Sequence, residues 1–355
     1  MPRSRTDPNF RRPAVGAHGL WFVNALRHPS VLLTGFPYLR GNRSLCRLPE
    51  RIVPSLPPLG RWVCRHSSGG ALRFRTDSRR IHLRAVFETV ETSANTPQNA
   101  LSGFDLYRRE GKEWRFVKTL AGPKGLHLVD DGAATAAPGF HEWLIYFPVR
   151  NHVQTLELGV DRGARLRPPG GRRSRYPVLF YGSSIVEGGC ASRAGLTYPA
   201  IIGRELDVDI INYGFGGSAL GEPEVARAIA ALKLSALVID YDHNAPSADH
   251  LRATHRRFFE IVRAAQPRLP VLLVSSVNIR NAPAYFGRRA AVIRDTWRRA
   301  RAAGDRRVWF LHGRDIYPRS GWWDCSCDLT HPNDRGFRLM ADAIGRVLRR
   351  MLSKG

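Results

Sequence analysis

The chain of 355 residues carries 55 Lys and Arg against 30 Asp and Glu, which gives a formal net charge of +25. Its hydrophobic content of 43% excludes an intrinsically disordered chain, and no run approaches the roughly 20 apolar residues that span a bilayer. The length suits one large or two ordinary domains. The basic start leads into an apolar stretch broken by His18 and Asn24, a poor signal peptide, so a cytoplasmic location is expected.

The positive charge raises the question of a nucleic-acid partner. Only five of the basic residues are lysines, and the arginines spread over the whole chain with short clusters such as Arg172-Arg173. Zinc-finger spacing, an RNA-binding sheet motif and a basic region with heptads are all missing from the sequence. We therefore expect no nucleic-acid partner and attribute the charge to arginine-rich coding.

The cysteines are odd in number and widely spaced. They are Cys46, Cys64, Cys190, Cys325 and Cys327. The only close pair is a Cys-x-Cys, which is too tight for the usual zinc spacing. We expect free thiols in a reducing compartment.

Residues 47–165 are predicted to form an antiparallel β-sandwich domain. Short segments here alternate apolar and polar residues, with no helical period between them. These segments are Arg73–Thr76, Ile81–Phe87, Phe104–Tyr107, Trp114–Val117, Glu142–Phe147 and Val153–Val160. Residues 1–46 show no clear period and are expected to be an N-terminal extension.

Residues 166–175, rich in proline, glycine and arginine, are predicted to be a linker. Residues 176–355 then alternate buried-strand runs with helical periods, which predicts an α/β domain with a parallel sheet sandwiched by helices. Strands are expected at Val178–Tyr181, Val208–Tyr213, Ala236–Tyr241, Val271–Val277 and Val308–His312. Helices are expected at Glu222–Leu234, Ala248–Ala265, Arg288–Ala302 and Asp334–Leu352.

Ligands of open parallel sheets bind outside the carboxyl ends of the strands, so residues that follow these strands are the first candidates for a site. The first strand runs into Gly182-Ser183-Ser184, where a sharp turn would present a serine hydroxyl clear of the sheet. Phosphate-binding and dinucleotide motifs do not fit, and Val186 stands where a nucleophile elbow needs glycine. An ordinary polar turn remains the alternative.

A second candidate lies near the end of the chain, in Asp328-Leu329-Thr330-His331. An Asp three residues before a His in one loop can orient the imidazole and leave its other nitrogen free to take a proton from a serine. Asp334 is the expected N-cap of the helix that follows. The alternative is a surface turn with an incidental histidine.

Two further strand ends carry residues that could bind an oxyanion. The turn after the second strand contains Gly217, whose amide could face the nucleophile, although the glycine could equally serve the turn alone. After the third strand, the side-chain amide of Asn244 could donate to the same oxyanion. Its neighbours Asp242 and His243 leave a metal site open as an alternative.

The combination of these features resembles the SGNH (GDSL-type) hydrolase family. The order is serine after the first strand, glycine after the second, asparagine after the third, and Asp with His near the C-terminus. Ser183 replaces the usual Asp before the nucleophile, and Asn244 lies in Asp-His-Asn-Ala-Pro rather than Gly-x-Asn-Asp. Upstream, Gly103–Tyr107 is similar to the G-x-D-L-Y signature of the β-rich domain that precedes one subgroup.

The resemblance implies a flavodoxin-like α/β fold and a serine esterase or acylhydrolase. It assigns Ser184, Asp328 and His331 to catalysis, and Ser184, Gly217 and Asn244 to the oxyanion hole, with no metal or organic cofactor. The expected substrate is a small-molecule or saccharide ester with a short acyl chain, and acetylated carbohydrates are among the candidates. An acyltransferase using the same site and a non-catalytic carbohydrate-binding protein are the alternatives. The number of subunits is not set by the sequence.

Overall fold

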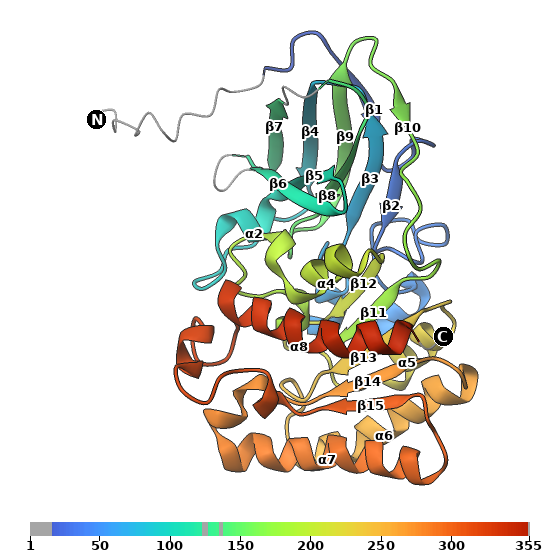
Figure 1. Cartoon of the computed structure of the whole chain (residues 1–355), viewed down its shortest axis with the longest axis vertical. Helices are drawn as coiled ribbons and strands as arrows, with labels where there is room; N and C mark the ends of the chain where they lie inside the picture. The colour runs from blue at the N-terminus through green and yellow to red at the C-terminus, as the bar shows by residue number, and fades with distance from the viewer. Residues whose placement is uncertain (1–15, 123–126, 135–137, 354–355) are drawn as a thin grey trace.

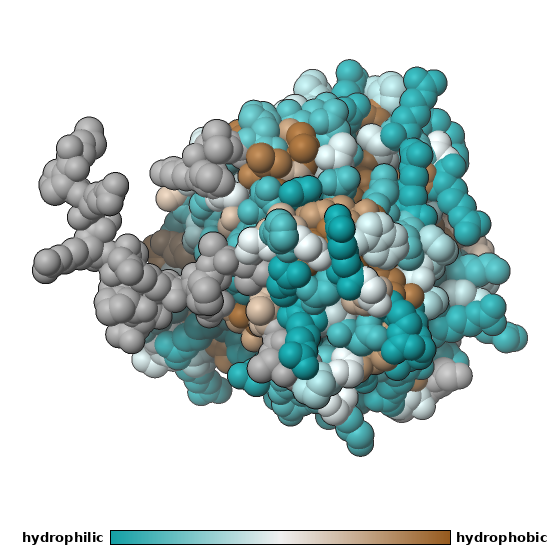
Figure 2. Space-filling model, turned by 90° about the horizontal axis from the view of Figure 1, so that it is seen from above, coloured by the Kyte–Doolittle hydropathy of each residue, from teal (hydrophilic) through white to brown (hydrophobic). Residues whose placement is uncertain are grey.

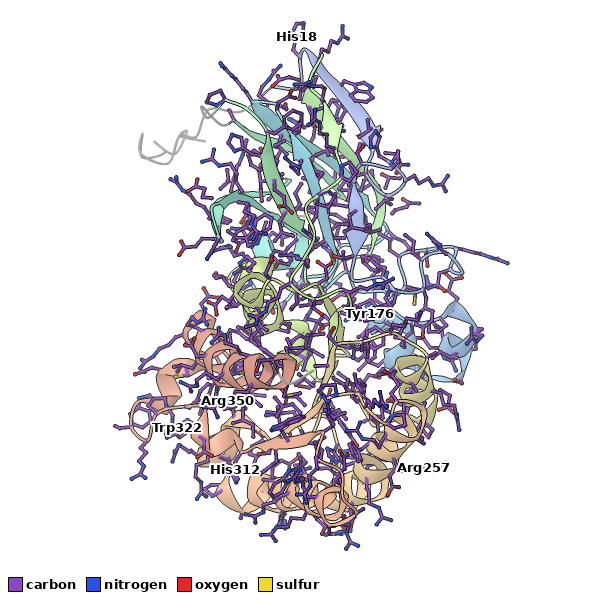
Figure 3. The ribbon with its side chains drawn as sticks, turned by 45° about the vertical axis from the view of Figure 1, so that its right-hand side comes forward. His18, Tyr176, Arg257, His312, Trp322 and Arg350 are labelled. Carbon is purple, nitrogen blue, oxygen red and sulfur yellow. The ribbon has the colours of Figure 1, made fainter. Side chains whose placement is uncertain are left out.

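The computed structural model describes residues 16–122, 127–134 and 138–353. Two parts, a β-sandwich and an α/β part, are stacked along the longest axis of the molecule (Figure 1). His18 lies at the outer end of the sandwich, and Tyr176 lies near the middle, where the chain enters the α/β part (Figure 3). The sandwich and the parallel sheet predicted from the sequence are both confirmed.

The β-sandwich consists of a four-stranded sheet in the order β1-β9-β4-β7 and a six-stranded sheet in which β10-β3-β8-β5-β6 are joined by β2 at β3. Its strands are β1 (Leu20–Asn24), β2 (Leu32–Thr34), β3 (Ala71–Thr76), β4 (Arg80–Phe87), β5 (Phe104–Glu110), β6 (Glu113–Leu120), β7 (Leu128–Ala134), β8 (His141–Tyr146), β9 (Val153–Asp161) and β10 (Leu166–Arg167). All described pairings are antiparallel. Alternate residues such as Phe74, Ile81 and Leu83 fill the space between the sheets and are fully buried.

The predicted extension and linker differ from the structure. Strand β1 pairs with β9 and β2 pairs with β3, so part of the 1–46 segment belongs to the sandwich. In the predicted linker, β10 pairs with β3, and the buried Arg172 donates hydrogen bonds to Asp207 and Asp209. These strands are too short to show a period, and their partners lie far away in the sequence.

The α/β part is built on a parallel sheet of five strands in the order β12-β11-β13-β14-β15. The strands are β11 (Val178–Gly182), β12 (Ile210–Gly214), β13 (Ala236–Asp240), β14 (Val271–Val274) and β15 (Val308–Leu311). The α-helices are α3 (Ser184–Glu187), α4 (Tyr198–Leu206), α5 (Pro223–Ala230), α6 (Ala248–Ala265), α7 (Pro283–Ala302) and α8 (Asp334–Leu352). The short 3-10 helices are η3 (Ala194–Leu196), η4 (Val277–Arg280), η5 (Gly313–Asp315) and η6 (Trp322–Cys325).

Helices cover both faces of this sheet, because both sets of alternate strand residues are apolar. Residues such as Leu179 and Leu237 pack on α5, α6 and α7, whereas Val178 and Val238 on the other face pack on α4 and α8. Helix α4 was not expected from the sequence. Only nine residues long, it begins with Tyr198-Pro199, where proline is tolerated because the first N–H has no helical partner.

The two parts are fastened together rather than loosely tethered. In sequence, η2 (Glu50–Ser55), α1 (Pro58–Val63) and α2 (Gln98–Ser102) belong to the first half. The segment around η2 and α1 nevertheless packs on the parallel sheet through Leu48, Leu56 and Val63. The fully buried Arg47 donates to the carbonyl oxygens of Asn212, at 2.8 Å, and Gly214, at 2.9 Å, on β12.

The surface of the molecule matches its charged composition. Hydrophilic residues predominate on the face seen from above, and hydrophobic residues form separate small patches there (Figure 2). Within the described residues, every helix is too short or too polar to cross a bilayer.

Candidate active site

Ser184 lies at the point where β11 turns directly into α3. Strand β11 is buried along its whole length, and a Cβ on its last residue, Gly182, would lie 2.0 Å from the Asp240 carbonyl oxygen. Only glycine therefore fits there. Ser183 is the N-cap of α3, and its hydroxyl accepts a hydrogen bond from the Ile185 N–H. Serine and aspartate are both good helix N-caps. Ser183 therefore caps α3 in the place where the family that the sequence resembles usually has Asp, and the turn is preserved.

The three residues predicted to carry catalysis form one hydrogen-bonded row. Ser184 Oγ lies 2.9 Å from His331 Nε2, and His331 Nδ1 lies 2.8 Å from Asp328 Oδ2. Ser184 follows β11, whereas Asp328 and His331 lie in the loop before α8, and Ser184 and His331 are 147 residues apart in sequence. In this arrangement the carboxylate holds the imidazole with its proton on Nδ1, so that Nε2 can accept the serine proton.

The loop that carries Asp328 and His331 is held by its own backbone. Asp328 Oδ1 accepts hydrogen bonds from the N–H groups of Thr330 and His331. Burial raises the pKa of Asp328, but its hydrogen bonds with His331 and Thr330 outweigh that effect and bring the pKa to about 2. The carboxylate is therefore ionised throughout the neutral range. The N-cap of α8 is Asn333, not the expected Asp334, whose carboxylate instead accepts from the Ser192 N–H.

The β-sandwich half contributes directly to this row. Asn95, in the loop between β4 and α2, donates from Nδ2 to Asp328 Oδ2 at 2.8 Å. In the same loop, Thr96 Oγ1 accepts the N–H of Cys190, which follows the nucleophile helix. Asn95 could not be predicted from the sequence, because no local motif marks a single amide that meets a carboxylate 233 residues away.

The two residues predicted to donate to the oxyanion, besides Ser184 itself, are Gly217 and Asn244. Gly217 has φ +69°, a left-handed conformation that favours glycine, and it lines the same cavity as Ser184. Asn244 also lines this cavity, and its Oδ1 accepts the Ala219 N–H at 3.3 Å. That bond orients the amide so that its NH₂ group is free to donate elsewhere. Gly216, the residue before Gly217, lies directly against the nucleophile, since a Cβ there would lie 3.4 Å from Ser184 Cβ.

His243, the neighbour of Asn244, has a different role from the other cavity residues. Its Nε2 hydrogen bonds with Ser276 Oγ at 2.6 Å, and burial lowers its pKa to about 3. It is therefore a neutral, fixed side chain. The metal alternative raised for Asp242 and His243 gains no support, because the described residues bring no third His, Cys or acidic ligand to them.

The cavity that exposes Ser184 has a volume of about 490 Å³ and walls from both parts of the molecule. The catalytic side is formed by Ser184, Gly216, Gly217, His243, Asn244, Thr330 and His331. A second side is formed by Leu59, Trp62, Val63, His66, Glu91, Arg150 and Glu187. Of the second group, only Glu187 belongs to the α/β half of the sequence.

His66 joins two carboxylates beneath this second side. Its Nδ1 lies 2.6 Å from Glu187 Oε1, and its Nε2 lies 2.7 Å from Glu91 Oε1. Burial lowers the pKa of His66, but the charge of Glu187 and the hydrogen bonds with both carboxylates raise it overall. Burial likewise raises the pKa of Glu91, and the His66 hydrogen bond brings it down to about 2. Because each ring nitrogen of His66 lies within hydrogen-bond distance of a carboxylate oxygen, we assign an imidazolium that donates from both nitrogens.

Two groups of potential metal ligands lie within the described residues. One is His66, Glu91 and His152, and the other is Cys190, Asp328 and His331. In the first group both His66 nitrogens already hydrogen bond to carboxylates, whereas the two His152 nitrogens have no hydrogen-bond partner among the described residues. In the second group His331 already hydrogen bonds to Asp328 and to Ser184. A metal in either place would have to replace those bonds.

Comparisons with known proteins cover both parts of the chain. Residues 175–349 match the model of the GDSL-like Lipase/Acylhydrolase family, and residues 21–166 match that of the N-terminus of SGNH-hydrolase-type esterases. No curated protein matches this chain.

Several solved structures share the fold. A GDSL-like lipase from Bacteroides ovatus is 24% identical with a TM-score of 0.84, covering 94% of this chain and 98% of that one. A salicylyl-acyltransferase from a tetracycline biosynthetic pathway is 19% identical with a TM-score of 0.76 and the same coverage. An acetyl xylan esterase from the rumen bacterium Butyrivibrio proteoclasticus is 12% identical with a TM-score of 0.61, covering 94% of this chain and 99% of that one.

Proposed function

The chain belongs to the SGNH (GDSL-type) hydrolases, in the subgroup with an N-terminal G-x-D-L-Y domain, and we propose that it cleaves short-chain acyl esters through an acyl-enzyme on Ser184. As a member of this family it is an enzyme acting on carboxylic ester bonds. The observation that carries the proposal is the row from Ser184 Oγ to His331 Nε2, 2.9 Å, and from His331 Nδ1 to Asp328, 2.8 Å.

In the acylation step, His331 Nε2 takes the proton of Ser184 as its Oγ attacks the ester carbonyl carbon. Asp328 stays ionised, because its pKa is about 2, and it stabilises the imidazolium that forms. His331 then returns the proton to the departing alcohol oxygen as the bond between that oxygen and the carbonyl carbon breaks. The products of this step are the free alcohol and an acyl group on Ser184.

The negative charge on the carbonyl oxygen needs donors that are already in place. We assign these to the backbone N–H groups of Ser184 and Gly217 and to the side-chain amide of Asn244. Support comes from the position of all three residues on one cavity and from the Ala219 N–H, which holds Asn244 Oδ1 and turns Nδ2 away from that bond.

Release of the acid requires water at the acyl-enzyme. The side chain of His331 is 23% exposed, so water can approach the imidazole that activates it. This favours hydrolysis over transfer. The likeness to a salicylyl-acyltransferase keeps transfer as the second candidate. Hydrolysis and transfer are separated by measuring the release of free acid with and without an added acceptor alcohol. A transferase would form a new ester with that alcohol instead of the free acid.

Carbohydrate acetyl esters are the proposed natural class of substrate. The support is the similarity in fold to family two carbohydrate esterases and to an acetyl xylan esterase. A panel of p-nitrophenyl esters of increasing acyl length, together with acetylated saccharides, tests both halves of the substrate. The proposal predicts the highest kcat/KM for acetyl esters.

The decisive variant is Ser184→Ala. It should abolish hydrolysis of p-nitrophenyl acetate and leave thermal unfolding unchanged, because the lost hydroxyl contacts only His331 among the described side chains. Ser353→Ala, at the end of α8, is the matched control and should keep full activity. Wild-type activity in Ser184→Ala would exclude the proposed nucleophile.

A further inference from the structure

Arg150, in the loop between β8 and β9, lines the cavity with its hydrogen-bonding capacity unused. Within the described residues its guanidinium makes ion pairs only at long range, 3.9 Å to Glu91 and 4.0 Å to Glu187. Its Nε is buried without a hydrogen-bond partner. The buried Arg47 nearby differs, because it donates to three backbone carbonyl oxygens.

The charges around Arg150 do not cancel. Glu187 is shared by His66, through a 2.6 Å hydrogen bond, and by Arg47, at 3.7 Å. Glu91 accepts hydrogen bonds from His66 and from Trp62 Nε1, both at 2.7 Å. Two carboxylates thus face three cations, and the excess positive charge lies on Arg150, whose side chain is 21% exposed.

Two apolar side chains that line the same cavity as Arg150 are exposed. Leu59 and Trp62, both on α1, line the cavity and are 48% and 43% exposed. The Trp62 indole is held in place by its hydrogen bond to Glu91 and by the His152 ring, 4.6 Å away between centroids. A substrate ring stacked on Trp62 would occupy the cavity that Ser184 and Arg150 also line.

We propose that Arg150 determines specificity by binding a carboxylate on the ring of the ester's alcohol part. This rests on the proposed esterase function and names its substrate class: short acyl esters of cyclic alcohols that carry a carboxylate. A planar guanidinium matches a carboxylate with two parallel hydrogen bonds. A doubly charged phosphate is disfavoured, because a single excess positive charge faces it and Glu91 lies close by.

A carboxylated ring can come from a sugar acid or from an aromatic acid, and two pairs of esters separate these sources. One pair is 4-acetoxybenzoate and its neutral analogue 4-acetoxybenzamide. The other is an acetylated methyl glucuronide and the corresponding acetylated methyl glucoside. Each enzymatic rate is divided by that ester's own rate of alkaline hydrolysis, which removes differences in intrinsic reactivity.

The wild-type protein should favour the charged member of at least one pair by about tenfold to a hundredfold in kcat/KM, the range of a hydrogen bond to a charged group. Arg150→Gln should remove that preference, because kcat/KM should fall far more for the charged ester than for the neutral one, and Arg150→Lys should keep only part of it. The matched control is Arg115→Gln, on β6, which changes the net charge equally and should retain the preference. The pair with the larger preference identifies the source of the carboxylate.

Two results would overturn this inference while the esterase function stands. The first is a wild-type protein that cleaves p-nitrophenyl acetate but shows no preference in either pair. The second is an Arg150→Gln variant whose kcat/KM falls equally for the charged and the neutral esters, which would make Arg150 a structural counter-ion of Glu91 and Glu187. A protein that cleaves no ester at all would instead refute the proposed function.

Discussion

Asn244 is the most direct residue for testing the proposed oxyanion hole, because the other two donors are backbone N–H groups. Only proline would remove these N–H groups, and it would also distort the backbone. Replacing Asn244 with alanine deletes the Nδ2 donor and the Oδ1 atom that accepts the Ala219 N–H at 3.3 Å. The carbonyl oxygen of the substrate gains its charge only in the transition state, so the loss should fall on kcat rather than on KM.

The expected fall in kcat depends on how far the side-chain amide of Asn244 is shielded from water. Loss of one oxyanion donor typically costs about 10²–10³ in turnover. Asn244 is only partly buried and the cavity is open to solvent, so water can replace part of the interaction. We therefore expect kcat of Asn244→Ala to fall about a hundredfold, at the lower end of that range. Ala219 is buried, so the loss of the acceptor of its N–H should cost the fold about 1–3 kcal/mol.

Steady-state hydrolysis of p-nitrophenyl acetate gives kcat and KM, and thermal unfolding reports the fold. Asn244→Asp sharpens the experiment, because it keeps an oxygen for Ala219 but brings negative charge to the oxyanion, and its activity should be lower still. Asn99→Ala, exposed on α2, is the control. A kcat for Asn244→Ala within about threefold of wild type, in a folded protein, would refute the proposed role.

Two other predictions test parts of the molecule that the sequence left unassigned. Asn95→Ala removes a hydrogen bond to the partly exposed Asp328 and should lower kcat about fivefold, whereas Thr92→Ala in the same loop should not. Equal activity of the two variants would show that the sandwich loop does not support catalysis. Asp240, at the buried end of β13, has its pKa raised to about 8 by burial and by the charge of Asp242. Its unfolded form ionises near 3.8, so this group costs stability increasingly as pH rises from about 4 to 8. Asp240→Asn should therefore gain stability over wild type, by about 1.4 kcal/mol per pH unit at most, between pH 5 and pH 8 in urea unfolding. If the difference in stability between Asp240→Asn and wild type stayed constant with pH, the raised pKa of Asp240 would be contradicted.

The sequence predicted those features that leave a local pattern. The five parallel strands are continuous apolar runs, and the residues after β11 and before α8 stand in short motifs, so the triad candidates could be chosen without a structure. Their meeting follows from topology, because parallel strands present their carboxyl ends at one edge of the sheet. Hence Ser184 and His331 come within 2.9 Å across 147 residues.

Features that depend on distant partners could not be predicted in this way. Strand β7 reads Leu-Val-Asp-Asp-Gly-Ala-Ala, which has weak alternation because it is an edge strand, and β1 is a strand only through its pairing with β9. Asn95 and Arg150 lie in loops of the sandwich half, and nothing in the sequence distinguishes them from the other polar residues of these loops. Their significance depends on how the sandwich is docked on the α/β part.

The central claim is that Ser184 is the nucleophile of an acyl-enzyme, and covalent labelling tests it most directly. The protein is treated with a fluorophosphonate ester, which reacts with activated serines, then digested, and the adduct is located by peptide mass spectrometry. We predict a single adduct on Ser184, formed in parallel with the loss of esterase activity and prevented by His331→Ala. An adduct on another residue that accompanies inactivation, or inactivation without modification of Ser184, would contradict this account.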